Sequence, residues 1–228
     1  MIGIYDYTVI LTYLSLLSAG TGIVISLSGT GHPYLGTFFL LFCGLCDAFD
    51  GKVARTKKNR TDMERNFGIQ LDSLSDVVAF GVLPACIGVA MLQTSNLPAA
   101  LGELGIWGLI ITVLIYAVLM AYILAALIRL AFFNVMEEER TKTETEPIKY
   151  YTGLPVTSAA LIFPTVALLR YLLKDCFDFS WFYFVAALIT GFLFLSKLQV
   201  KKAGMLGLLI MIGIGLAESV ALIILKLL

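Results

Sequence analysis

The apolar stretch GIWGLIITVLIYAVLMAYILAALIRLAFFNV occupies residues 105–135, and Arg129 is its only charged residue. A helix needs about 20 apolar residues to cross the hydrocarbon core of a bilayer, because each residue adds only about 1.5 Å. The whole chain of 228 residues shares this character, with 59% hydrophobic residues, 14% charged residues and a mean hydropathy of +0.92. A soluble domain carries about 25% charged residues. The composition therefore indicates an integral membrane protein.

Seven segments are apolar and long enough to span a bilayer. We expect an all-α polytopic protein, a bundle of about seven transmembrane helices, with six or eight as alternatives. Short breaks that are polar or contain Gly and Pro separate the segments, and no second domain is evident, so residues 1–228 are expected to form a single membrane-embedded domain. The expected spans are residues 8–28, 34–55, 68–94, 105–135, 153–173, 180–198 and 204–226.

The basic residues predict the orientation of the bundle. Their total of 16 equals that of the acidic residues, and the zero net charge argues against nucleic acid as a partner. In a seven-helix arrangement, thirteen of the 16 fall on one face, within residues 52–65, 129–149 and 197–202. The positive-inside rule makes that face cytoplasmic, with the amino terminus inside and the carboxyl terminus outside. Trp107 and Trp181 then lie near the outer interface.

Four aspartates lie in the second and third expected spans, although a carboxylate inside a spanning helix costs at least a few kcal/mol. The sequence CDAFDGKVAR covers residues 46–55, and GIQLDSLSD covers residues 68–76. Helical periodicity puts the acidic and small residues of each segment on one stripe near its cytoplasmic end. The stripes are Asp47, Asp50, Gly51 and Ala54 on the first segment, and Gly68, Asp72 and Asp76 on the second.

Facing stripes would bring four like charges into one pocket, where they could not all stay ionised unaided. Two divalent cations would balance them. Ligation by oxygen alone favours Mg²⁺ or Mn²⁺, with Ca²⁺ as a further occupant. Gly51, Ala54 and Gly68 leave room for a bulky ligand, and Arg55 offers donors suited to phosphate oxygens. The alternative is that each aspartate is a structural hydrogen-bonding residue. That explanation could account for one aspartate, but it accounts poorly for four on two stripes with small residues between them.

The two stripes resemble the signature of CDP-alcohol phosphotransferases, here Asp47-x-x-Asp50-Gly51-x-x-Ala54-Arg55 followed by Gly68-x-x-x-Asp72-x-x-x-Asp76. The spacer of twelve residues between Arg55 and Gly68 is longer than in many members of the family and resembles the phosphatidylserine synthase branch. Further stretches resemble that branch, namely LDSLSDVVAFGVLPA (71–85), RLAFFNV (129–135), YYTGLP (150–155) and FLFLSKLQVKK (192–202).

The resemblance implies transfer of the phosphatidyl group of CDP-diacylglycerol to L-serine, with release of CMP. It also implies a homodimer in a prokaryotic cell membrane, with a metal site in the cytoplasmic half of the bundle. By the same resemblance the metal ligands are Asp47, Asp50 and Asp72, and Asp76 is the general base that can also contact the metal. The CDP-binding positions are Asp47, Asp50, Gly51, Ala54, Arg55, Gly68 and Asp72.

Serine brings a carboxylate that must be held beside an anionic site. Arg129 is a candidate because it ends an apolar segment on the cytoplasmic side, and Asn134 follows it. The alternative for Arg129 is that its side chain extends to the lipid headgroups, as long cationic side chains at helix ends do. Lys197 and Lys201 could hold lipid phosphate, or serve only as determinants of topology.

Three other functions fit parts of the pattern. Intramembrane prenyltransferases also hold a diphosphate with aspartates, but they lack the continuation from Gly51 to Arg55. A sibling phosphotransferase could use glycerol phosphate or inositol phosphate, which should require a further basic pocket. A divalent-cation transporter should continue its polar path beyond Asp76, where the sequence instead runs VVAFGVLPACIGVAML.

Overall fold

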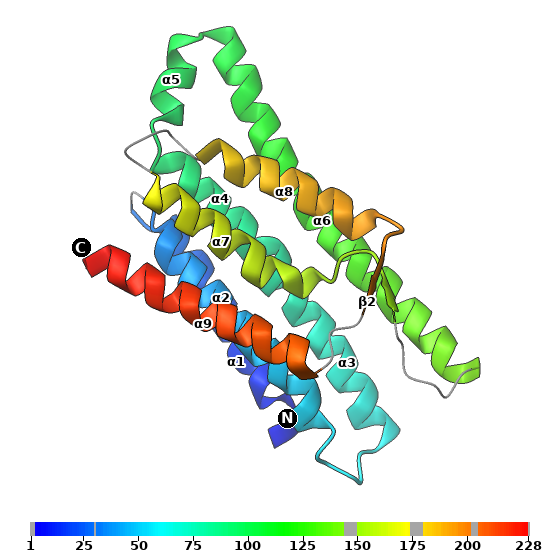
Figure 1. Ribbon diagram of the computed structural model, residues 1–228. Helices are drawn as coiled ribbons and strands as arrows, with labels where there is room; N and C mark the ends of the chain where they lie inside the picture. The colour runs from blue at the N-terminus through cyan, green and yellow to red at the C-terminus, as the bar shows by residue number, and fades with distance from the viewer. Residues whose placement is uncertain (1–2, 30, 144–149, 174–179, 202–204, 228) are drawn as a thin grey trace.

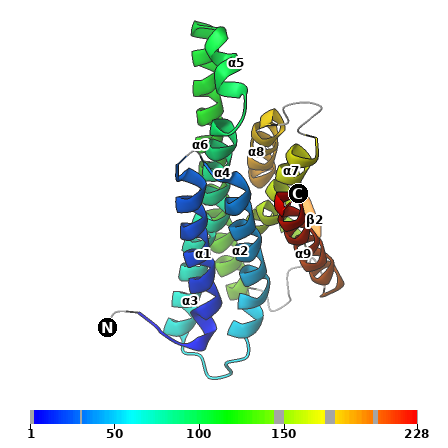
Figure 2. The same ribbon diagram turned by 90° about the vertical axis from the view of Figure 1, so that its left-hand side faces the viewer.

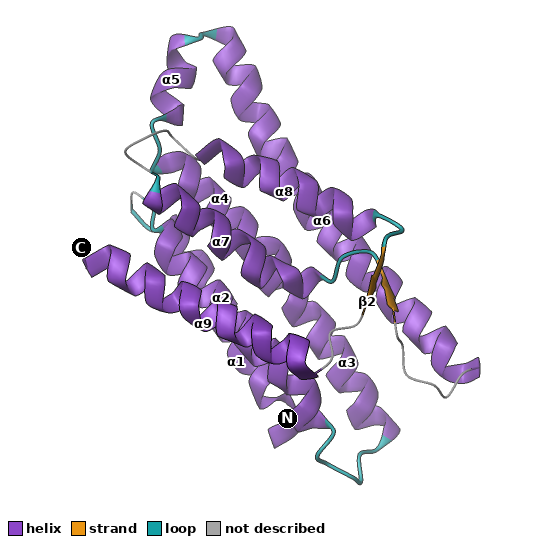
Figure 3. Ribbon diagram, in the orientation of Figure 1, coloured by secondary structure: helices purple, strands orange, loops and turns teal. Residues whose placement is uncertain are grey.

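The computed structural model describes residues 3–29, 31–143, 150–173, 180–201 and 205–227. Helices make up most of these residues, with one small sheet (Figure 3). The helices are η1 (Tyr7–Val9), α1 (Ile10–Leu27), α2 (Pro33–Ala54), α3 (Asp62–Asp76), η2 (Val77–Val82), α4 (Leu83–Gln93), α5 (Leu97–Glu103), α6 (Ile106–Thr143), η3 (Val156–Ser158), α7 (Ala159–Leu172), α8 (Ser180–Leu195) and α9 (Met205–Leu227). The strands are β1 (Tyr150–Thr152) and β2 (Gln199–Lys201).

The helices form two groups around a shared core (Figures 1 and 2). Helices α1, α2 and the continuous run of α3, η2 and α4 lie on one side, and α7, α8 and α9 lie on the other (Figure 2). Helix α2 joins the groups because it packs against α1, α4, α7 and α9. Helix α6 packs against α4, η2 and α8. The amino terminus lies at the same end of the bundle as the loop between α2 and α3 (Figure 1).

Four helical runs have the length and hydropathy of membrane spans, at Tyr7–Leu27, Pro33–Ala54, Asp62–Gln93 and Ile106–Arg140. Shorter apolar helices cover Val156–Arg170, Ser180–Leu195 and Leu209–Ile224. Each of the seven expected segments therefore contains an apolar helix. These features confirm a polytopic integral membrane protein, while the number of helices that cross the bilayer stays a prediction.

Two helices extend beyond their expected bounds. Helix α3 begins at Asp62 rather than near residue 68, because Thr61 and Glu64 form a capping box in which each side chain accepts a hydrogen bond from the other's backbone N–H. Helix α6 continues to Thr143, past the expected end at residue 135. Its polar extension carries the ion pair between Glu137 and Arg140, which are three residues apart. Hydropathy marks the apolar part of a helix and misses such polar turns.

The all-α expectation is wrong in one detail, because β1 and β2 form an antiparallel pair. Tyr150 pairs with Lys201, and Thr152 pairs with Gln199. Gly153 follows β1 with φ +78°, a conformation that favours glycine, and its N–H donates to the carbonyl of Leu198 at 2.7 Å. This pairing joins the segment that precedes α7 to the segment that follows α8. The strands are short and distant in sequence, so the hydropathy pattern does not reveal them.

The run from α3 to α4 is continuous although it contains Pro84 and a π-helical segment. Proline has no N–H, so the carbonyl of Phe80, four residues earlier, loses its usual helical partner. The hydroxyl of Tyr122 on α6 donates to that carbonyl at 2.5 Å. The hydroxyl of Tyr183 on α8 donates to the carbonyl of Pro84 at 2.6 Å. Two buried tyrosines therefore stabilise the irregular part of the helix, which begins directly after Asp76.

Close packing of α2 against α7 depends on Gly44. A Cβ atom added at Gly44 would lie 2.5 Å from the Cβ of Ala160, which belongs to a short side chain that cannot move aside. We expect Gly44→Ala to lower the free energy of unfolding by about 1–3 kcal/mol, the usual cost of overpacking. Gly20→Ala on α1 is the matched control, because its Cβ would meet no described atom within 4 Å. Equal melting temperatures of the two variants in one detergent would contradict the prediction.

Candidate functional site

Three aspartates form an acidic cluster between α2 and α3. Asp47 and Asp50 lie on the last two turns of α2, and Asp72 lies on the facing side of α3. One carboxylate oxygen from each of the three lies within 4.8 Å of those of the other two. All three residues are half-buried. Residues on different helices thus present converging oxygen ligands, which is the arrangement that a hard divalent cation requires.

Asp76 lies one helical turn beyond Asp72 and is more deeply buried, with 7% of its surface exposed. It is not one of the three residues whose oxygens lie within 4.8 Å of one another. It does line the same cavity as Asp47 and Asp72. The geometry therefore separates a cluster of three converging carboxylates from a fourth carboxyl that is more deeply buried.

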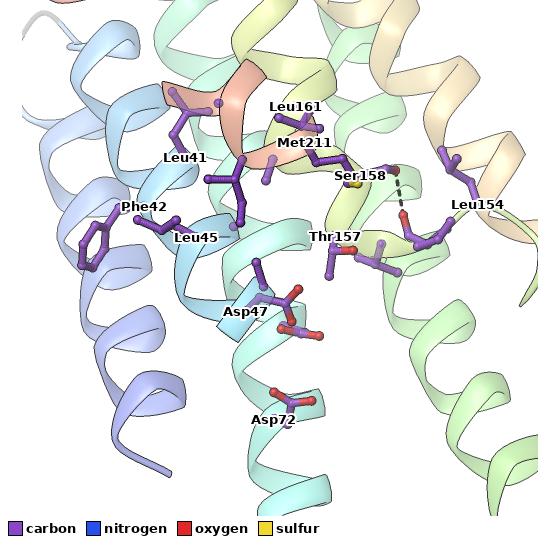
Figure 4. Close-up of a pocket in the computed structure, with 18 of the residues that line it drawn as sticks. Leu41, Phe42, Leu45, Asp47, Asp72, Leu154, Thr157, Ser158, Leu161 and Met211 are labelled. Atoms are coloured by element: carbon purple, nitrogen blue, oxygen red, sulfur yellow. Dashed lines mark hydrogen bonds between the residues drawn. The ribbon is translucent and has the colours of Figure 1, made fainter. Parts of the chain in front are cut away.

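Asp47, Asp72 and Asp76 occupy one end of a cavity of about 730 Å³. Helices α2, α3, α6, α7 and α9 contribute to its wall, with Val200 of β2 and the segment from Leu154 to Ser158 (Figure 4). The rest of the wall is mostly apolar and includes Leu41, Leu45, Leu161 and Met211. Figure 4 shows the labelled Asp47 and Asp72 below these apolar side chains. A cavity that is acidic at one end and apolar over the rest suits an amphiphilic ligand.

Arg129 on α6 lines the same cavity as the aspartates. Only 6% of its surface is exposed, so the side chain does not extend to the lipid headgroups. Its Nε donates to the carbonyl of Leu154 at 3.1 Å, and its guanidinium lies 4.8 Å from the centre of the Phe133 ring. These contacts orient a cation toward a cavity that also contains buried carboxyl groups. The burial argues against the headgroup interpretation, and a ligand-binding role for Arg129 stays a prediction.

The other candidates for binding serine or lipid phosphate lie elsewhere. Asn134 donates from Nδ2 to Oγ of Ser73 at 2.6 Å and does not line the cavity. Lys197 is exposed after α8 and does not line the cavity either. The side chain of Lys201 lies outside the described residues. The described contact therefore gives Asn134 the role of joining α6 to α3.

The expected CDP-binding positions lie on the loop side of the acidic cluster along each helix, since Gly51, Ala54 and Arg55 follow Asp50 and Gly68 precedes Asp72. Ala54 is the last residue of α2. The Nη1 atom of Arg55 lies 3.6 Å from the position that a Cβ on Gly51 would occupy. The Nη2 atom of Arg60, in the loop before α3, lies 2.7 Å from the position that a Cβ on Gly68 would occupy. The Arg60 guanidinium thus occupies space that a side chain at Gly68 would need, whereas Arg55 lies at ordinary contact distance from the Cβ position of Gly51.

Glu218 on α9 is a buried acid that sequence analysis missed. It is 7% exposed, and its Oε1 accepts a hydrogen bond from Oγ1 of Thr165 on α7. Its Oε2 is buried and has no hydrogen-bond partner among the described residues. The neighbouring Ser219 lines the cavity. The signal was available, because Glu218 is an acidic residue within an apolar segment and meets the criterion that identified the aspartates.

The chain matches the family of CDP-alcohol phosphatidyltransferases over residues 8–194. It belongs to this family. The match includes all four aspartates and the described helices from η1 to α8, except Tyr7 at the start of η1 and Leu195 at the end of α8. The family assignment made from the aspartate signature is therefore confirmed.

Relatives of this family member carry two names. The chain is 34% identical over 140 residues to a CDP-diacylglycerol–serine O-phosphatidyltransferase of Saccharomyces cerevisiae, covering 60% of this chain and 43% of the relative. It is 34% identical over 150 residues to an archaetidylserine synthase of Methanothermobacter thermautotrophicus, covering 65% and 53%. A CDP-diacylglycerol–serine O-phosphatidyltransferase of Methanocaldococcus jannaschii is 28% identical over 205 residues, covering 89% and 78%. The chain thus spans about half the length of the first two relatives.

Proposed function

We propose that this protein is a CDP-diacylglycerol–serine O-phosphatidyltransferase, which transfers the phosphatidyl group of CDP-diacylglycerol to the hydroxyl of L-serine and releases CMP. The observation that carries the proposal is a single cavity lined by Asp47, Asp72, Asp76 and Arg129 and by a long apolar wall, with Asp50 completing the acidic cluster beside it. The donor is an anionic nucleotide attached to a lipid, and the acceptor is an amino acid with a carboxylate. The names of the relatives support the choice of serine.

Asp47, Asp50 and Asp72 would hold the metal, because their oxygens converge and hard cations prefer such ligands. We propose two ions, either Mg²⁺ or Mn²⁺, and Ca²⁺ can also occupy the sites. Asp76 can add a fourth carboxylate to the metal ligands. When bound, a divalent cation supplies charge stabilisation to the diphosphate and to the departing CMP. Gly51, Ala54, Arg55 and Gly68 complete the nucleotide-binding surface with the three aspartates.

The transfer step uses Asp76 as general base. Asp76 accepts the proton of the serine hydroxyl while the hydroxyl oxygen attacks the phosphorus that carries diacylglycerol. The new P–O bond forms as the bond from that phosphorus to the CMP oxygen breaks. Arg129 holds the serine carboxylate through a charge-assisted hydrogen bond, and its contact with Leu154 orients the guanidinium. The low exposure of both side chains limits competing attack by water.

The remainder of the proposal concerns the setting of the reaction. The apolar wall of the cavity accommodates the diacylglycerol chains, so the lipid substrate enters from the bilayer. Residues 1–228 form a single domain with about seven transmembrane helices, and the protein is a homodimer in a prokaryotic cell membrane. The loop between α2 and α3 carries Lys57, Lys58 and Arg60, and Arg65 lies near the start of α3, which supports a cytoplasmic position for this end of the bundle.

The deciding experiment measures incorporation of labelled serine into chloroform-soluble lipid by purified protein. CDP-diacylglycerol and an archaeol-based CDP-lipid are tested as donors, each with Mn²⁺, Mg²⁺ or a chelator. We expect incorporation only with a metal, accompanied by release of one CMP per serine. Metal-dependent CMP release with glycerol phosphate or inositol phosphate, and none with serine, would retain the site and overturn the acceptor. Absence of CMP release with every acceptor, from folded protein, would overturn the enzyme assignment in favour of transport or prenyl transfer.

A further inference from the structure

Arg60 lies in the spacer between Arg55 and Gly68, whose basic residues served above only to predict the orientation of the bundle. Its Nη2 atom donates to the carbonyl of Glu64 at 3.2 Å, and this hydrogen bond directs the guanidinium along the first turns of α3. The same atom would lie 2.7 Å from a Cβ on Gly68. The Arg60 guanidinium therefore packs against Gly68, in the space that a side chain at this position would need. Gly68 precedes Asp72 by four residues on one helical stripe, a rise of about 6 Å.

The donors of Arg60 are only partly used. Its Nε is buried and has no hydrogen-bond partner among the described residues. A buried N–H without a partner is unfavourable, so such a donor commonly serves a ligand or an ordered water. A guanidinium has five donors in one plane and can bind two phosphate oxygens at once. The geometry thus leaves an anion-binding face beside the acidic cluster.

The neighbouring cation Lys57 is engaged elsewhere. Its Nζ lies 2.7 Å from Oδ2 of Asp6 and 2.8 Å from Oε1 of Glu64. The hydrogen bond from Lys57 lowers the pKa of Asp6 to about 2, so Asp6 stays ionised near neutral pH. Lys57 therefore ties the amino-terminal segment to the spacer. Among the described arginines of the spacer, Arg60 is the one whose guanidinium rests on a residue of the aspartate stripes.

We propose that Arg60 is a substrate-binding residue that contacts the diphosphate of the CDP-lipid, and the phosphate of CMP after transfer. This inference rests on the proposed function and adds a residue outside the aspartate signature. Arg55, which lies beside Gly51 of α2, and Arg60, which lies beside Gly68 of α3, would contact the nucleotide from two sides. The small size of Gly68 then has a second use, because it admits the guanidinium as well as the ligand.

The test compares Arg60→Ala and Arg60→Lys with Arg65→Ala, an exposed arginine of the same segment. We expect Arg60→Ala to raise KM for the CDP-lipid and the inhibition constant of CMP by about 10- to 100-fold, the usual loss for a hydrogen bond to a charged group. KM for serine should change less than about twofold. Arg60→Lys should recover part of the effect. Similar values for Arg60→Ala and Arg65→Ala would overturn the proposal.

A double-mutant cycle with Gly68→Ala separates binding from folding. The added methyl group displaces the flexible end of Arg60, so we expect Gly68→Ala to weaken CMP binding in the parent and much less in an Arg60→Ala background. Additive effects would overturn the proposal. Binding of CMP in the presence of Mn²⁺ is measured by calorimetry and does not need turnover. If no acceptor supports turnover while Arg60→Ala still weakens CMP binding, then the proposed reaction fails and the role of Arg60 stands.

Discussion

Asp76→Asn should lower kcat by about 100- to 10,000-fold while Mn²⁺ binding stays close to that of the parent. This range is the usual contribution of a general base, and a carboxamide of the same shape cannot accept the proton of the serine hydroxyl. Binding should largely survive because the three residues whose oxygens converge within 4.8 Å stay intact, and Asp76 only adds a contact to them. Serine incorporation gives the rate, and calorimetric titration with Mn²⁺ gives the affinity.

Asp72→Asn provides the contrast, because Asp72 is one of the three converging carboxylates. We expect this variant to lose Mn²⁺ affinity by at least about tenfold, the lower limit seen even for changes beyond the direct ligands of a metal. Asp62→Asn is the matched control, since Asp62 is exposed in the first turn of α3. Loss of Mn²⁺ affinity in Asp76→Asn as large as that in Asp72→Asn would assign Asp76 to the metal rather than to proton transfer.

Arg129→Gln should raise KM for serine by about 10- to 100-fold, the cost of losing a hydrogen bond between charged groups. KM for the CDP-lipid should change little, because the acidic cluster, Arg55 and Arg60 bind that substrate. Gln keeps hydrogen-bonding groups where the contact with Leu154 is made, which limits damage to the fold. Initial rates measured over a range of both substrates separate the two KM values.

The control for Arg129 is Arg140→Ala, eleven residues along the same helix and in an ion pair with Glu137 outside the cavity. We expect its kinetic constants to match those of the parent. A rise in KM for the CDP-lipid alone in Arg129→Gln would show that Arg129 holds lipid phosphate and not serine. Unchanged constants in a folded variant would remove Arg129 from the binding site.

Much of the bundle could be predicted because helix formation in a membrane follows from local composition. A run such as residues 105–135 has no stable alternative in lipid, since every backbone N–H and C=O must be satisfied within the segment. The polar extensions at Asp62 and Thr143 were not predicted, because they depend on capping and ion pairs outside the apolar run. The pairing of β1 with β2 depends on residues about 50 apart in sequence, and local patterns carry no information about it.

The sequence by itself determined the family, the membrane class and the alignment of the aspartates on two helical stripes, because these follow from composition and from a spacing of three or four residues. The tertiary structure alone decided which carboxylates converge, that Arg129 lies buried in the same cavity, and that Arg60 rests on Gly68. These distances join segments that are far apart in the chain or separated by a loop. They are set by how whole helices pack, which no short-range spacing can specify.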